Sequence, residues 1–335
     1  MSWDWDATTL GAVSAFLAAR GLHAGPLNPR RIGAGHSNLT YLIRSSPGMV
    51  LRRPPPPPLP KGAHDVVREA QVLKALEGSG VPVPRVLAVA QAGEALDVPF
   101  YVMEHVQGTV ISDTLPDWLV PEHREGLALA LVDGLAALHA VDWRACGLSG
   151  FGNPEGFNAR HLRRLHGVMT ARDTALPRGM LAMHDWLATR VPPESGSSIV
   201  HNDYRLGNVM WAPGLPPRLA AVLDWELATL GDPLLDVGYL MVCYPDPARE
   251  LTPTMELSAA FLAPGFPPLS ALIERYSAIS GRDLSNLGWY AAMAAWKMAV
   301  LYDYSRRLGQ DSYYADEAQS LRFLTYAERI AATMA

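Results

Sequence analysis

The sequence predicts an α+β protein with two unequal lobes: a small antiparallel sheet with one main helix, followed by a larger and mostly helical lobe. Short segments rich in β-branched and aromatic residues, separated by turn formers, dominate the chain up to residue 106. After Gly108 the apolar residues recur at helical spacing instead. This change of pattern predicts a single domain over 1–335, with lobes at about 1–103 and 109–335 and a connector at about 104–108.

The small lobe is predicted to begin with a helix over 8–20, which Gly21 ends. Turn formers bound three short segments that we expect to pair as antiparallel strands, 29–34, 38–44 and 49–53. A helix and two more strands are then predicted, in that order, over 64–76, 85–91 and 99–106.

A run of five prolines, Pro54 to Pro58, follows the third predicted strand. Each ring fixes φ and removes a backbone donor, so the run must be extended. It fits a stiff surface loop, and it also fits a ligand for a proline-binding domain. The residues leave both interpretations open.

In the large lobe, Pro121 suits a first helical position, and leucines at helical spacing follow it as far as residue 139. Further helices are predicted over 158–169, 178–190, 233–243, 268–279, 284–306 and 313–333. Short strand-like segments are expected at 198–200, 208–211 and 219–223. One apolar stripe, Trp289, Met293, Trp296 and Val300, has helical spacing that fits either the core or a substrate surface.

Composition excludes several classes of protein. The net charge is −5 and the Lys and Arg residues are scattered, so there is no electrostatic footprint for nucleic acid. Cys146 and Cys243 are too few for a disulfide framework and lack the paired spacing of a zinc site. The N-terminus has no signal-peptide pattern, and no run of about 18 apolar residues suggests a membrane span. We therefore expect a cytoplasmic protein without nucleic-acid or membrane partners.

The strongest functional signal is a His-x-Asp pattern at His201 and Asp203, followed five residues later by Asn208. Sixteen residues further on, Asp224 ends an apolar strand-like segment. Phosphoryl transfer needs a carboxylate that orients and deprotonates the acceptor hydroxyl, together with hard oxygen ligands for Mg²⁺. Asp203 suits the first role, and Asn208 and Asp224 suit the second. We expect His201 to brace the loop rather than to react.

These residues resemble the catalytic and metal loops of the aminoglycoside-phosphotransferase and choline-kinase superfamily, distant relatives of protein kinases. The similarity covers nearly the whole chain from about residue 28, and it is closest to the branch whose members are sometimes joined to acyl-CoA dehydrogenases. The stretches that carry this last likeness are 50–55, 99–104 and 231–238. The resemblance implies a two-lobed protein-kinase-like fold that uses ATP and Mg²⁺.

By this resemblance, the glycine-rich stretch 33–38 occupies the place of a loop that covers phosphates. Gly35 would let backbone donors approach the phosphate oxygens, and Ser37 and Asn38 could donate further hydrogen bonds. A Gly-x-Gly pattern is also typical of a plain hairpin turn, so both interpretations remain open.

Strand alternation places Val50 and Arg52 on one face, where Val50 could touch adenine and Arg52 could reach the phosphates. Protein kinases use Lys at this position, paired with a Glu of the next helix. Here Arg52 replaces it, and Glu69 is the natural partner. Arginine keeps the positive charge but differs in shape from lysine.

The resemblance makes Glu104 and Val106 part of the connector whose backbone binds adenine, with Met103 beside the pocket. Asp236, near the start of an apolar helix, could cap that helix or brace the backbone of the catalytic loop. Glu226 could add a second metal contact or remain solvated.

These assignments predict an ATP- and Mg²⁺-dependent kinase that phosphorylates a hydroxyl of a small molecule. Residues 246–335 hold ten Asp and Glu against eight Lys and Arg, a balance too even for a dedicated polycation site. We therefore expect a neutral or anionic acceptor such as a hydroxyacyl thioester. The alternatives are an aminoglycoside-modifying kinase and a kinase-like module that binds nucleotide without turnover. A metal-dependent hydrolase would need a second ligand cluster beside His201 and Asp203.

Overall fold

The structure is a computed structural model that describes residues 5–23, 25–33, 38–43, 48–56, 64–172, 175–248 and 250–334. By its internal contacts the chain divides into a first unit, Met1–Gln107 with Ala220–Ala228, and a second unit, Gly108–Leu219 with Thr229–Ala335. The first unit contains a small antiparallel sheet and the second is mostly helical, which confirms the predicted α+β class.

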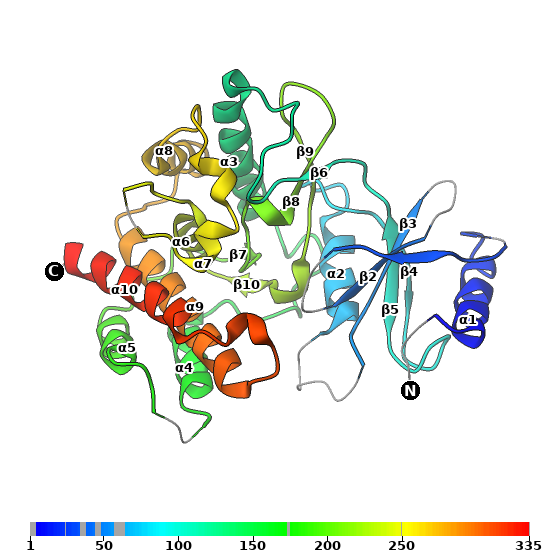
Figure 1. Cartoon of the computed structure of the whole chain (residues 1–335), viewed down its shortest axis with the longest axis horizontal. Coiled ribbons are helices and arrows are strands. Elements are labelled where there is room, and N and C mark those ends of the chain that lie inside the picture. The colour runs from blue at the N-terminus through cyan, green and yellow to red at the C-terminus, as the bar shows by residue number, and fades with distance from the viewer. Residues whose placement is uncertain are drawn as a thin grey trace. The chain divides into compact units, whose positions relative to one another are not determined.

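The sheet of the first unit has five strands in the order β1-β2-β3-β5-β4, with antiparallel neighbours (Figure 1). The strands are β1 (Pro29–Arg31), β2 (Leu39–Ile43), β3 (Met49–Arg53), β4 (Val86–Ala90) and β5 (Phe100–Glu104). They correspond to the five strands predicted from the sequence. The central strand β3 pairs with both β2 and β5, so its side chains lie in the middle of the sheet.

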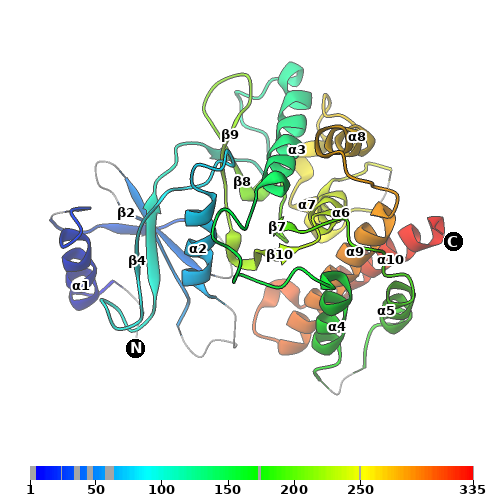
Figure 2. The ribbon, with the colours of Figure 1, turned by 180° about the vertical axis from the view of Figure 1, so that it is seen from behind.

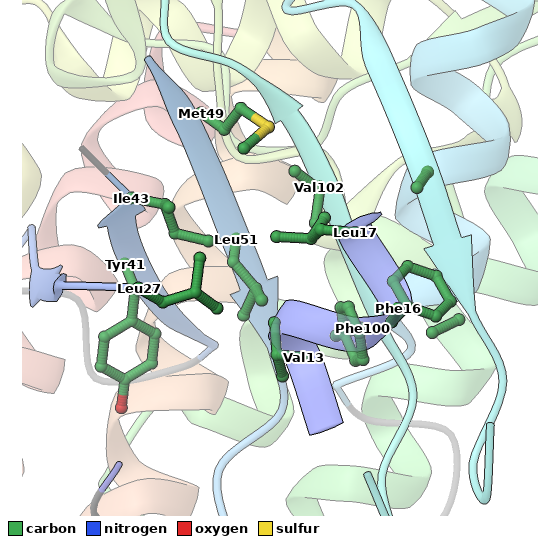
Figure 3. Packing of buried hydrophobic residues seen from close by; sticks show 12 residues of the cluster. Val13, Phe16, Leu17, Leu27, Tyr41, Ile43, Met49, Leu51, Phe100 and Val102 are labelled. Carbon is green, nitrogen blue, oxygen red and sulfur yellow. The ribbon is translucent and has the colours of Figure 1, made fainter. Parts of the chain in front are cut away.

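Two helices cover the opposite faces of this sheet, α1 (Ala7–Ala18) and α2 (Val66–Leu76). Figure 3 shows Leu51 of β3 in the apolar core with Val13 and Leu17 of α1. The next residue, Arg52, instead bonds to Glu69 of α2. Because successive side chains of a strand point to opposite faces, α1 lies on the Leu51 face and α2 on the Arg52 face.

The start of α2 is fixed by a side-chain cap. Oδ1 of Asp65 accepts a hydrogen bond from the backbone N–H of Arg68 at 3.0 Å, which satisfies one of the free donors of the first turn. Glu69 follows in the same turn and is 2% exposed. The cap therefore helps to fix the position of Glu69 in the first turn of α2.

Residues 220–228 belong to the first unit, although the sequence placed them with the helical lobe. They contain most of β9 (Leu219–Val222) and the 3₁₀ turn η3 (Trp225–Leu227). The backbone N–H of Val222 donates to the carbonyl of Pro82 at 2.8 Å, and Arg68 of α2 reaches the carbonyl of Ala228 at 3.5 Å. These contacts join segments that are far apart in the sequence. They bring Asp224 and Glu226 into the unit that contains Arg52.

The helices of the second unit are best seen from behind (Figure 2). They are α3 (Arg124–Ala140), α4 (Phe157–Met169), α5 (Met180–Ala188), α6 (Leu234–Cys243), α7 (Pro253–Glu256), α8 (Leu269–Ser280), α9 (Leu287–Leu308) and α10 (Glu317–Thr333). Short strands lie between them: β6 (Thr109–Val110), β7 (Ser198–Val200), β8 (Val209–Trp211) and β10 (Thr229–Gly231). The one-turn helix α7 and the strands β6 and β10 were not predicted. No helix in the described ranges is both long and apolar enough to cross a membrane.

Helix α9 is the centre of the second unit, with α10 beside it and α6 packed against it (Figures 1 and 2). Its apolar stripe is fully buried, at 1% exposure or less for Trp289, Met293, Trp296 and Val300. The indole N–H of Trp296 donates to the carbonyl of Met180 at 3.0 Å. The stripe therefore belongs to the core and not to a substrate surface.

Candidate active site

The first cluster of predicted site residues surrounds Arg52 in the first unit. Nε of Arg52 lies 2.9 Å from Oε2 of Glu69, and Nη2 lies 2.6 Å from Oδ1 of Asp224 and 3.7 Å from Oε2 of Glu226. Nη1 reaches Oγ1 of Thr40 at 3.4 Å. One guanidinium therefore bridges three carboxylates that come from α2 and from the segment after β9.

The opposite charges of this cluster stabilise each other's ionised forms. Burial alone would lower the pKa of Arg52, but the carboxylates of Glu69, Asp224 and Glu226 outweigh it and raise that pKa, so the guanidinium stays charged. Burial raises the pKa of Glu69 to about 7, even though Arg52 opposes the rise. The Glu69 carboxylate thus depends on Arg52 to remain ionised near neutral pH.

Asn38 extends the cluster on the side of the glycine-rich stretch. Its Nδ2 donates to Oε2 of Glu226 at 3.2 Å, and its Oδ1 lies 3.2 Å from Nδ1 of His64. Gly35 and Ser37, the other residues predicted for this stretch, lie outside the described residues. Asp224 has φ of +63°, in the left-handed region that residues other than glycine seldom adopt.

The predicted adenine connector lies at the end of β5. Val50 of β3 is the register partner of Met103, so these two residues are neighbours across the sheet. The backbone N–H of Glu104 donates to the carbonyl of Arg85 at 2.9 Å, and that of His105 donates to the carbonyl of Gly48 at 3.1 Å. The N–H groups of Glu104 and His105 therefore already have hydrogen-bond partners within the first unit. Val106 follows, half-buried and outside the strand.

The second cluster, in the second unit, surrounds Asp203. Its Oδ2 accepts a hydrogen bond from Nδ2 of Asn208 at 2.7 Å, and its Oδ1 accepts one from the hydroxyl of Tyr239 at 2.5 Å. Nε of Arg205 lies 3.6 Å from Oδ1. The carboxylate is thus held on both oxygens, yet its side chain remains 23% exposed.

Asp236 holds the backbone of the loop that contains Asp203. Its carboxylate accepts hydrogen bonds from the N–H groups of His201 and Asn202, each at 2.7 Å, and from Nε2 of His139 at 3.2 Å. Burial alone would raise the pKa of Asp236, but the hydrogen bond and charge of His139 hold it below its ordinary value. These contacts match a brace rather than a helix cap.

His201 supports the same loop from within. It is fully buried, and its Nδ1 accepts a hydrogen bond from the backbone N–H of Asp203 at 3.2 Å. Asn202, between them, has φ of +67°, and its carbonyl accepts a hydrogen bond from Nζ of Lys297 at 3.0 Å. The loop conformation is therefore fixed by side chains of α6 and α9.

Three residues of the second cluster were not predicted from the sequence: Arg205, Tyr239 and Lys297. Two of them had a signal. Tyr239 follows Asp236 by three residues on a predicted helix, which places both on one face. Lys297 interrupts an apolar helix, and a lysine among buried residues usually has a charged or polar partner.

Each unit contains oxygen donors that suit a hard divalent cation. In the first unit, Asp224 and Glu226 offer carboxylates on side chains that are 34% and 21% exposed, respectively. Asn208 directs its N–H₂ group at Asp203, so its side-chain oxygen is the atom suited to a metal. Within the described ranges no group of three or more His, Cys, Asp or Glu could hold a metal ion. Mg²⁺ does not need one, because it is commonly held by one or two carboxylates together with phosphates.

A stability prediction follows from the Arg52–Glu69 pair. Arg52→Met should lower the free energy of unfolding by about 3–5 kcal/mol at neutral pH, because it leaves a buried carboxylate without its partner. Without Arg52 the folded state favours protonated Glu69, whereas the unfolded state releases that proton above the ordinary value of 4.5. The pKa of Glu69 in the wild-type protein is already about 7, so the two folded proteins differ in the ionisation of Glu69 only above that pH. The loss should therefore grow as pH rises from 7 to about 9. Urea unfolding with a chelator present measures it. Adding Glu69→Gln should restore most of the loss, and a pH-independent loss would contradict the explanation.

Residues 29–272 match the model of the phosphotransferase enzyme family, and the chain belongs to this family. It is 35% identical over 285 residues to acyl-CoA dehydrogenase family member 11 of Gallus gallus. The matched region covers 82% of this chain but only 36% of that relative. The family resemblance inferred from the sequence is confirmed. The family match identifies the chain as a phosphotransferase domain.

Solved structures agree with this assignment. An aminoglycoside phosphotransferase-like protein of Ralstonia eutropha is 29% identical, with a TM-score of 0.75 over 96% of this chain and 95% of that chain. The ternary complex of an aminoglycoside phosphotransferase with ADP and hygromycin B has a TM-score of 0.63 at 16% identity and covers 95% of this chain and 98% of that one. At that identity the second likeness shows the fold alone.

Proposed function

We propose that this phosphotransferase transfers the γ-phosphate of ATP, with Mg²⁺, to a hydroxyl of a neutral or anionic small metabolite. The observation that carries the proposal is the carboxylate of Asp203, which is fixed on both oxygens and still partly exposed. A base of this kind can orient an acceptor hydroxyl and take its proton as the phosphoryl group arrives.

The first cluster is proposed to bind the nucleotide. Arg52 would contact phosphates from its ion pair with Glu69, as the Lys–Glu pair of protein kinases does. Asn38, and Gly35 and Ser37 beside it, would cover the phosphates. Val50 and Met103 would face adenine, while the carbonyl of Glu104 and the backbone of Val106 would hydrogen-bond its edge.

Asp224 and Asn208 are proposed to hold Mg²⁺, with Glu226 in support. When bound, the metal would neutralise charge on the phosphates. A nucleotide-binding module without turnover had its only support in the replacement of Lys by Arg at position 52. Because Arg52 makes the expected pair with Glu69, that support is weak.

The acceptor is proposed to be neutral or anionic because carboxylates of the second unit are already paired. Asp303 is buried between Arg306 at 2.7 Å and Arg307 at 2.9 Å. Asp232 accepts hydrogen bonds from Ser195, Asn158 and Tyr290. A polycationic acceptor would have to compete with these internal donors.

Two positive side chains lie beside the catalytic loop instead. Arg205 is 3.6 Å from Asp203, and Lys297 donates to the loop carbonyl at Asn202. The Gallus gallus relative carries the name acyl-CoA dehydrogenase family member 11, and an acyl-CoA is a large anion. We therefore propose a hydroxyacyl thioester as the leading acceptor.

The test is a steady-state comparison of three acceptor classes with ATP and Mg²⁺: a hydroxyacyl-CoA, choline and a kanamycin-type aminoglycoside. We expect saturable phosphorylation of the hydroxyacyl-CoA and little of the other two. Asp203→Asn protein serves as the blank for background hydrolysis. Efficient phosphorylation of the aminoglycoside at micromolar concentration would overturn the acceptor class and leave the kinase activity standing. Turnover that is independent of any acceptor would contradict the whole proposal.

A further inference from the structure

Tyr239 makes a contact that none of the roles above explains. It lies on α6 one turn after Asp236 and is 3% exposed. Its hydroxyl donates to Oδ1 of Asp203 at 2.5 Å, while Asn208 holds Oδ2 at 2.7 Å. Two donors from separate elements, α6 and η2 (Leu206–Asn208), therefore grip opposite oxygens of one carboxylate.

The position of the Tyr239 ring is itself fixed by packing. Nζ of Lys297 on α9 lies 4.7 Å from the ring centroid and donates to the carbonyl of Asn202 at 3.0 Å. Gly238, the preceding residue, lets α6 approach α9 closely, since a Cβ there would come within 2.6 Å of the Tyr290 backbone. The phenol thus has little freedom to leave Asp203.

The phenol also remains a donor. Burial and the negative charge of Asp203 raise the pKa of Tyr239 well above its ordinary value. The hydroxyl therefore keeps its proton throughout the range in which a kinase works, and the hydrogen bond to Asp203 persists.

We propose that Tyr239 is a positioning residue, whose hydroxyl fixes the plane of the Asp203 carboxylate so that its exposed edge faces the acceptor hydroxyl. This inference rests on the proposed role of Asp203. A catalytic group that is already held in the reactive geometry does not have to be oriented at each turnover, and a small misplacement lowers the rate strongly. Without the phenol, Oδ1 would keep only its longer contact with Nε of Arg205, at 3.6 Å, and the carboxylate could rotate about its Cβ–Cγ bond away from the acceptor.

Tyr239→Phe keeps the ring and removes the hydroxyl. We expect kcat for hydroxyacyl-CoA phosphorylation to fall roughly 10-fold or more, with the KM for ATP unchanged. Tyr244→Phe is the matched control, because Tyr244 is also buried and its hydroxyl also makes one 2.5 Å hydrogen bond, to the carbonyl of Pro267. It should keep the kcat of the wild type. Equal losses of kcat in the two variants would show a structural effect and overturn the inference.

A double-mutant cycle separates this inference from the proposed function. If Tyr239 acts through Asp203, Tyr239→Phe should cause no further loss of turnover in the Asp203→Asn background. A full additional loss would overturn the positioning role. If Asp203→Asn abolishes turnover while Tyr239→Phe behaves as Tyr244→Phe does, the proposed function stands and this inference fails. If wild-type protein phosphorylates none of the acceptors, both fail.

Discussion

Asp203→Asn should lower turnover roughly 10²- to 10⁴-fold, which is the usual contribution of a positioned general base. Asparagine keeps the size of the side chain, and its single oxygen can accept a hydrogen bond from Tyr239 or from Asn208, which bind opposite oxygens of Asp203. Its neutral amide cannot take the proton from the acceptor hydroxyl. The measurement is initial-rate phosphorylation of the hydroxyacyl-CoA, with nucleotide affinity determined separately by calorimetry.

Two comparisons make the Asp203 result specific. Asp133→Asn is the matched control, because Asp133 is an exposed carboxylate of the same unit, 2.7 Å from Nε of Arg275. It should leave turnover unchanged. MgATP affinity should stay nearly the same in the Asp203→Asn protein, since the first cluster is intact. Near-normal turnover in folded Asp203→Asn protein would falsify the assignment.

Asp224→Ala should abolish Mg²⁺-dependent nucleotide binding more completely than Asp203→Asn does. Asp224 is the most exposed carboxylate of the Arg52 cluster and the main proposed ligand of the metal. A loss of one charged metal ligand should weaken MgATP binding at least about 10-fold, or about 1.4 kcal/mol. Binding of ATP without metal should not weaken, because the variant also removes negative charge near the phosphates.

Calorimetric titration with a non-hydrolysable ATP analogue measures both quantities, once with Mg²⁺ and once with a chelator. Glu94→Gln is the control, because Glu94 is an exposed carboxylate of the same unit and is 46% exposed. We expect the Asp224→Ala protein to keep its fold, since Arg52 keeps its ion pair with Glu69. Equal MgATP affinity in wild-type and Asp224→Ala proteins would rule out Asp224 as the main metal ligand.

The elements of the fold were predictable because their signals are local. Alternation in β3 placed Val50 and Arg52 on one face, and apolar residues at helical spacing defined α2. Element ends were less accurate. The helix expected from Pro121 begins as a 3₁₀ turn, Pro121–His123, before α3 starts at Arg124. Such ends depend on tertiary contacts that a short sequence window does not contain.

The same limit explains the residues that were missed. Asp203, Asn208 and Asp224 lie in a spacing that is readable along the chain. Tyr239 and Lys297 matter because of where α6 and α9 pack, and they come 36 and 94 residues after Asp203. Their contacts with the catalytic loop, 2.5 Å for Tyr239 and 3.0 Å for Lys297, join segments that are far apart in sequence.

The sequence by itself determined the fold class, the family and the identity of the charged residues, because periodicity and motif spacing are properties of the linear chain. Only the tertiary structure decided which partners those charges have. It grouped residues 220–228 with the first unit, so that Arg52 bridges Glu69 and Asp224, and it turned Asp236 toward the loop backbone. Buried charges and donors must be paired wherever the folded chain brings a partner, and that choice depends on packing between distant segments.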